Sequence, residues 1–159
     1  TQILTLHSWT TAISISATTL NLLLVALFSL INVILLVCGS YTYFLFSASL
    51  PYFLTDLGMF MCGRYPEEFY EGGYQAYSFV DSSVLFLLVA AAFVAIAFYV
   101  VCYLCSKKNK VGWIIAALAF FIIDTGVLFF EYDLASSVID IVFHIYVIVC
   151  STTYGQIFC

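Results

Sequence analysis

Residues 111–130, VGWIIAALAFFIIDTGVLFF, form an almost wholly apolar run that contains one charged side chain, Asp124. A helix needs about 20 such residues to cross the ~30 Å hydrocarbon core of a bilayer. Because lipid cannot hydrogen-bond the backbone, an open segment of this kind crosses as a helix. The stretch therefore predicts a transmembrane helix that carries a carboxyl group inside the membrane.

Three further apolar stretches flank this one, and together they predict an all-α fold, a transmembrane four-helix bundle. The four expected spans cover about residues 18–46, 83–105, 111–130 and 134–158. The composition agrees, because the chain is 65% hydrophobic and only 8% charged, whereas soluble domains carry about 25% charged residues. The mean hydropathy is +1.14. We expect residues 1–159 to form a single transmembrane domain in contact with the lipid bilayer.

The basic residues predict an orientation. Three of the four, Lys107, Lys108 and Lys110, lie between the second and third expected spans. Loops rich in lysine and arginine stay on the cytoplasmic side. We therefore expect a multi-pass protein of the cytoplasmic (cell) membrane with both termini in the cytoplasm.

Residues 48–82 form the expected outer segment, which is acidic and rich in aromatic residues. Residues 50–61 are expected to form a short helix on the outer surface. Pro66, which precedes two glutamates, favours a second helix start, and Gly72–Gly73 would end it. The segment predicts a cap over the outer mouth of the bundle. The alternative is an aromatic belt at the level of the lipid headgroups.

Two ionisable residues interrupt the fourth stretch, SSVIDIVFHIYVIVCS at residues 136–151. They are Asp140 and His144, one helical turn apart on one face. If the preceding turn is centred on Tyr132, Asp124 and Asp140 are each eight residues from that centre, or ~12 Å along their helices. The spacing predicts two carboxyl groups at matching depth with the imidazole close by.

These residues carry the leading functional hypothesis. An ionisable side chain that faces lipid is costly, so such residues face partners or water and indicate function. Asp124, Asp140 and His144 could relay a proton or hold a cation or small polar ligand, supported by Asn32 of the first span. Asp140 and His144 could also be two ligands of a metal ion, with Asp124 as a third. No cofactor is expected.

Two alternatives stay open. In the first, the protein is a non-catalytic accessory or assembly protein. The polar residues then only lock helices together, and the outer segment meets a partner membrane protein or a second copy. In the second, Cys102 and Cys105 form the reactive pair of a membrane thiol oxidoreductase. Their expected cytoplasmic position disfavours this, because such pairs work on the oxidising side.

Other classes are disfavoured by the sequence. It contains no familiar catalytic signature, so an enzyme is not expected. The net charge of −5 argues against nucleic-acid binding.

Three stretches also carry a family resemblance: YFLFSASLPYFLTDLG, YLCSKKNKVGWIIAALAFFIIDTGVLFF and VIDIVFHIYVIV. Together they resemble a group of uncharacterised small four-span membrane proteins of Gram-positive bacteria. The resemblance implies a bacterial cytoplasmic membrane and brings no activity with it.

Overall fold

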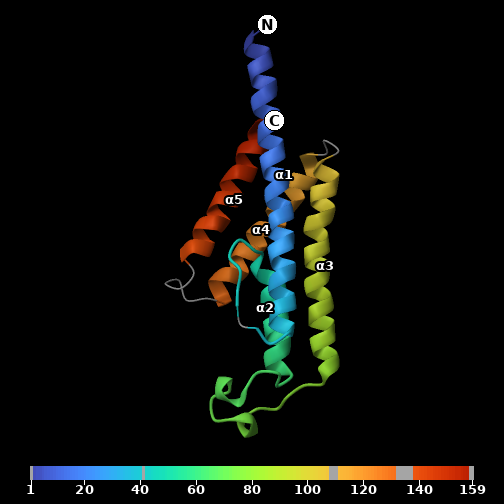
Figure 1. The fold of residues 1–159 in the computed structure, drawn as a ribbon, viewed down its shortest axis with the longest axis vertical. Coiled ribbons are helices and arrows are strands. Elements are labelled where there is room, and N and C mark those ends of the chain that lie inside the picture. Colours follow the sequence, from blue (N-terminus) through green and yellow to red (C-terminus); the bar gives the residue numbers. More distant parts are fainter. Residues whose placement is uncertain (1, 41, 108–110, 132–137, 158–159) are drawn as a thin grey trace.

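The computed structural model describes residues 2–40, 42–107, 111–131 and 138–157, with side chains over 19–40, 42–107, 112–129, 138–149 and at Thr152. The described residues form helices and no β-strand (Figure 1). The α-helices are α1 (Gln2–Val37), α2 (Ser49–Met61), α3 (Ser82–Ser106), α4 (Val111–Glu131) and α5 (Val138–Ile157), and two 3₁₀ turns are η1 (Glu67–Phe69) and η2 (Tyr74–Ala76). Lys108, Lys110 and the turn around Tyr132 lie outside the described residues.

Three of the described helices are long and apolar enough to cross a membrane. Their spanning parts are Thr19–Val37, Ser82–Ser106 and Gly112–Phe129. Val138–Val149 of α5 is a shorter apolar helix. The all-helical fold is confirmed, and the long apolar helices are those expected of an integral membrane protein.

Each long helix buries one stripe of residues and leaves apolar side chains exposed on the rest of its surface. In α4 the buried residues recur every three or four positions, as on one helical face: Ile114, Ala117, Phe121, Asp124 and Leu128. The opposite face exposes Ile115, Ile122, Ile123 and Phe129. Asp124 therefore lies on the packed face of α4, and apolar side chains cover the outside.

The first helix differs from the expected span of residues 18–46. It begins at Gln2 and ends at Val37, where Gly39 adopts a φ of 77°. The Ser40 N–H bonds the Leu35 carbonyl and the Gly39 N–H bonds the Leu36 carbonyl, both at 2.9 Å. This pattern is a Schellman motif, which closes a helix at a left-handed glycine. The apolar run continues beyond it, but the helix does not.

After α1 the chain turns back and runs beside the helix it has just left (Figure 1). The Phe44 N–H bonds Asn32 Oδ1 at 2.8 Å, and the Ala48 N–H bonds Ser29 Oγ at 2.8 Å. Ser29 lies eight residues before Val37, which is ~12 Å along the helix. Residues 42–48 therefore penetrate about two helical turns into the helical layer before α2 begins.

The predicted helix at residues 50–61 exists as α2, but it does not lie on the surface. It packs against α1, α3 and α4, and its buried residues include Pro51, Thr55, Gly58 and Met59. The helix is buried because it starts at the deepest point of the returning segment and runs back between α1, α3 and α4.

Gly58 sets the distance between α2 and α3. A Cβ atom at this position would lie 3.0 Å from Leu85 Cδ1 and 3.4 Å from Leu85 Cα. A Cβ atom at Gly126, in α4, would meet nothing within 4 Å. The absence of a side chain at Gly58 therefore allows the close approach.

We expect Gly58→Leu to destabilise the protein by about 1–3 kcal/mol, because a larger side chain must push α3 away. Gly126→Leu is the matched control and is expected to leave stability unchanged or raise it, since glycine is a poor helix former. Thermal unfolding in detergent measures both. Equal melting temperatures for the two variants would contradict this packing.

The segment between α2 and α3 is a packed cap. Tyr65 and Tyr70 are buried against Leu36 and Met59. The Tyr70 hydroxyl donates to the Phe60 carbonyl at 3.0 Å. The helix expected after Pro66 is the single turn η1. A headgroup belt does not account for tyrosines buried inside the protein, so the cap interpretation fits these residues better.

Asp81 closes the cap and starts α3. Its side chain accepts a hydrogen bond from the Ser83 N–H at 2.8 Å, as an N-cap does. Hydrogen bonds from Ser83 hold the pKa of Asp81 below its usual value.

Candidate functional site

The start of α2 is the centre of the site. The first N–H groups of a helix have no partner within the helix. The Ser49 N–H donates to Asp124 Oδ2 at 2.9 Å, and the Leu50 N–H donates to Asp124 Oδ1 at 2.7 Å. Asp124 is fully buried. A carboxyl group of α4 therefore caps α2 with both oxygens, at the end where the helix dipole favours negative charge.

The remaining groups at this helix start are also accounted for. The N-cap residue, Ala48, has no side chain that could cap the helix, and its own N–H bonds Ser29 of α1. Pro51 follows in the first turn and has no N–H. Every backbone donor at the start of α2 thus has a partner or does not exist.

Asn32 holds the returning segment. Its Nδ2 atom donates to the Phe44 carbonyl at 2.8 Å and to Ser47 Oγ at 2.9 Å, and its Oδ1 accepts from the Phe44 N–H. The residue is fully buried. The sequence predicts Asn32 as a supporting residue of the acid and histidine cluster, whereas its amide contacts the loop at residues 44–47.

Asp124 also contacts His144 of α5. The His144 Nε2 atom lies 3.3 Å from Asp124 Oδ2, and both side chains are fully buried. The His144 Nδ1 atom lies 2.8 Å from the Asp140 carbonyl oxygen, so Nδ1 carries a hydrogen. Two arrangements satisfy the contact with Asp124: an imidazolium beside a carboxylate, or a neutral imidazole that accepts from a carboxylic acid.

Aromatic rings enclose this pair. Phe121 stacks on the His144 ring with centroids 4.7 Å apart and an interplanar angle of 14°. Phe143 meets the same ring edge-on at 5.9 Å. An apolar enclosure strengthens hydrogen bonds and raises the cost of an unpaired charge. A cavity of about 420 Å³ between α1 and α5 is lined by Asn21 and by hydrophobic side chains that include Phe46 and Phe143, and not by the pair.

Asp140 contacts the loop instead of Asp124. Its carboxyl group accepts a hydrogen bond from the Phe46 backbone. Its Oδ1 atom is buried without a partner among the described residues. Phe46 adopts a φ of 70°, a conformation that is costly for a residue with a side chain. The Asp140 contact lies at this strained position.

Asp124 lies at the depth of a different residue of α5 from the one predicted. The sequence predicts Asp140 at the depth of Asp124, but the residue that contacts Asp124 is His144. Asp124 lies seven residues before the end of α4, and His144 lies six residues after the start of α5. Asp140 lies only two residues after that start, because residues 132–137 separate the helices. The residue that contacts Asp124 is thus four positions, or about one helical turn, later in the chain than a tight hairpin centred on Tyr132 predicts.

The predicted metal site would need Asp124, Asp140 and His144 to converge on one ion. Among the described residues, no group of three histidine, cysteine, aspartate or glutamate side chains is arranged to hold a metal ion.

The redox hypothesis rests on Cys102 and Cys105. Both are free thiols, and Cys102 is fully buried in the core.

Comparison of the chain with known protein families, with curated proteins and with solved structures finds no match.

We expect Asp124→Ala to destabilise α2 by about 2–6 kcal/mol, because two buried N–H groups lose their partner at about 1–3 kcal/mol each. Hydrogen–deuterium exchange followed by mass spectrometry should show faster exchange at the Ser49 and Leu50 amides. Thr125→Val is the control. It changes the neighbouring residue, whose hydroxyl bonds only its own helix at Phe121. Unchanged protection in Asp124→Ala would contradict the capping role.

Proposed function

We propose that the protein is a four-span integral membrane protein in which α2 is a re-entrant helix, with the function of a non-catalytic accessory or assembly protein. The intramembrane polar residues hold α2 in place, and α2 carries the cap at residues 62–81 to the membrane face where a partner meets it. One observation carries the proposal: both carboxyl oxygens of Asp124 accept backbone N–H groups of α2.

The contacts of the other polar residues support the same proposal. Asn32 bonds the loop at Phe44 and Ser47, and Asp140 bonds it at Phe46. Irregular backbone at membrane depth is tolerated only where protein or a wet cavity satisfies it. Three of the four candidate residues, Asp124, Asn32 and Asp140, therefore bond the continuous stretch formed by the returning segment and the start of α2.

The orientation is part of the proposal. The Lys107 side chain lies at the end of α3 opposite the cap, with Nζ 4.7 Å from the centre of the Tyr103 ring. The positive-inside rule places this end in the cytoplasm together with both termini. The cap is then at the outer face, where acidic residues are common. The resemblance to membrane proteins of Gram-positive bacteria supports a bacterial cytoplasmic membrane.

Side-selective labelling tests the re-entrant path. Cys38 is exposed at the end of α1, and Met61, at the end of α2, is an exposed position for an introduced cysteine. In oriented vesicles, we expect a membrane-impermeant maleimide to modify both Cys38 and the cysteine of Met61→Cys from the same face. If the two positions reacted only from opposite faces, α2 would be a spanning helix and the proposal would fail.

The contact between Asp124 and His144 favours a second candidate, proton handling. The two groups lie 3.3 Å apart inside an aromatic enclosure, and histidine and aspartate side chains are components of proton relays in membranes. In this candidate, capping and proton exchange use the same carboxyl group.

We expect a proton carrier to acidify dye-loaded proteoliposomes faster than empty liposomes, and His144→Gln to remove the difference. Glutamine keeps a polar side chain but cannot exchange a proton near neutral pH. Ser106→Ala, at another buried polar position, is the control. Wild-type flux equal to that of empty liposomes would reject this candidate and leave the accessory role standing.

A further inference from the structure

A pocket of about 470 Å³ lies between α2 and the cap, away from the buried pair. It is lined by Tyr52, Asp56, Phe60, Tyr65 and Phe69. The first three lie four residues apart along α2 and therefore share one helical face. The volume falls within the range of pockets for small ligands, about 300–1,000 Å³. The site combines one carboxyl group with four aromatic rings.

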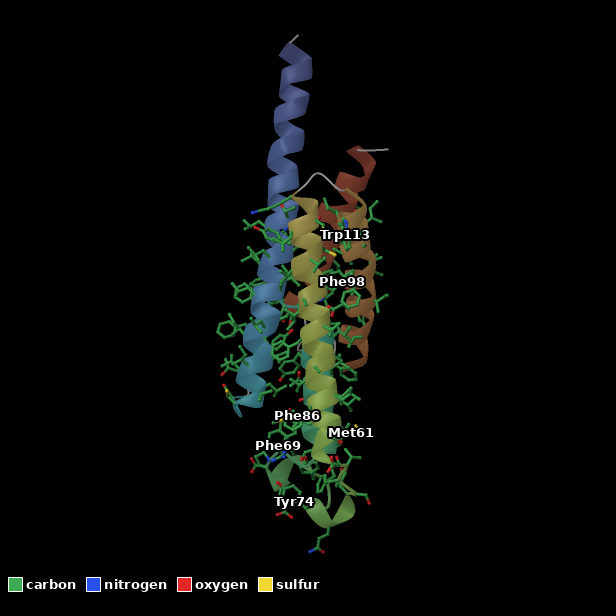
Figure 2. The ribbon with its side chains drawn as sticks, turned by 90° about the vertical axis from the view of Figure 1, so that its right-hand side faces the viewer. Met61, Phe69, Tyr74, Phe86, Phe98 and Trp113 are labelled. Carbon is green, nitrogen blue, oxygen red and sulfur yellow. The ribbon has the colours of Figure 1, made fainter. Side chains whose placement is uncertain are left out.

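The rings are fixed by their neighbours. Phe60 stacks on Tyr70 with centroids 5.0 Å apart, and Tyr52 meets Tyr43 edge-on at 5.0 Å. Tyr65 and Phe69 lie 5.3 Å apart across the η1 side of the pocket. Phe69 is 50% exposed and lies at the cap end of the molecule, far from Trp113 (Figure 2). The rings of the pocket are thus held by aromatic neighbours, and Phe69 is its exposed edge.

Among the residues that the structure describes, Asp56 has no cationic partner. The Tyr65 hydroxyl donates to Asp56 Oδ1, and burial raises the pKa of the carboxyl group. The nearby Arg64 guanidinium donates to Ser82 Oγ at 3.0 Å. In the described part of the chain, no lysine or arginine forms an ion pair with an acid. A partly desolvated carboxylate in an aromatic pocket is therefore left without a counter-charge.

We propose that this pocket binds an organic ammonium ion, with Asp56 as the counter-charge and the aromatic rings in contact with the N-alkyl groups. Cations over aromatic faces gain about 0.5–2 kcal/mol per contact, and rings around a quaternary ammonium form an aromatic cage. The proposal deepens the accessory function and rests on it, because the pocket is formed by α2 and the cap that α2 carries.

Two sources supply this chemistry: a free solute with a methylated ammonium group, or the choline headgroup of a lipid. The pocket recognises the ammonium group that they share. The pocket extends along α2 from Tyr52 to Phe69 of the cap, whose exposed ring is the side from which a solute or a headgroup can reach it.

Calorimetric titration of tetramethylammonium into the full chain in maltoside detergent tests the site. We expect saturable binding to the wild type, and at least about tenfold weaker binding to Asp56→Asn and to Phe69→Leu, since each loses a cation contact. Glu71→Gln is the charge-matched control, because Glu71 is an exposed acid of the cap outside the pocket, and its affinity should equal that of the wild type. Absence of binding, or equal affinities for Asp56→Asn and Glu71→Gln, would overturn the proposal.

Lipid nanodiscs separate the two sources. If the choline headgroup occupies the pocket, tetramethylammonium binds more weakly in phosphatidylcholine than in phosphatidylglycerol, and Asp56→Asn removes the difference. Equal affinity in both lipids assigns the site to a free solute. Amide exchange at Ser49 and Leu50 in the same samples reports on α2. Protected amides without tetramethylammonium binding reject the pocket alone, whereas unprotected amides reject the re-entrant helix.

Discussion

A helix that starts inside the apolar layer must have partners for its first backbone N–H groups. Water supplies them for a helix in solution, but hydrocarbon cannot, and each unpaired group costs several kcal/mol. In this protein Asp124 of α4 bonds the Ser49 and Leu50 N–H groups, and Ser29 of α1 bonds that of Ala48. These three contacts hold the start of α2, and packing against α1, α3 and α4 holds the rest of the helix.

The other polar side chains in the apolar helices follow from the same constraint. A segment that enters the apolar layer and leaves on the same side exposes non-helical backbone on its way in. Asn32 pairs with both backbone groups of Phe44. His144 is the further partner of Asp124, with Nε2 3.3 Å from Oδ2, and a buried carboxyl group that accepts two N–H groups needs such a partner. Polar residues on three different helices thus serve one short segment.

Much of the helical architecture could be predicted from the sequence, since apolar runs near 20 residues specify long helices and a charged residue within them must be buried. The break after Val37 could not, because residues 42–46 are as apolar as the helix before them and hydropathy does not distinguish a loop from a span. The local signals were Gly39, which favours a left-handed helix end, and Pro51, which favours a helix start.

The sequence also does not identify the partner of Asp124. The number of residues between two side chains on neighbouring helices predicts their relative depth only when the length of the intervening turn is known. The aromatic pocket was missed for another reason. The tyrosines and phenylalanines of the cap have the composition of a headgroup belt, and only the fold brings Phe69 to the face of α2 that carries Asp56.

The bond between Ser49 and Asp124 joins residues 75 positions apart in the chain. During synthesis, α1, the returning segment and α2 all leave the ribosome before α4 exists. Until α4 has been synthesised, the start of α2 has no carboxyl group to accept the Ser49 and Leu50 N–H groups. The final packing of α2 therefore waits for α4, a helix that is made two helices later in the chain.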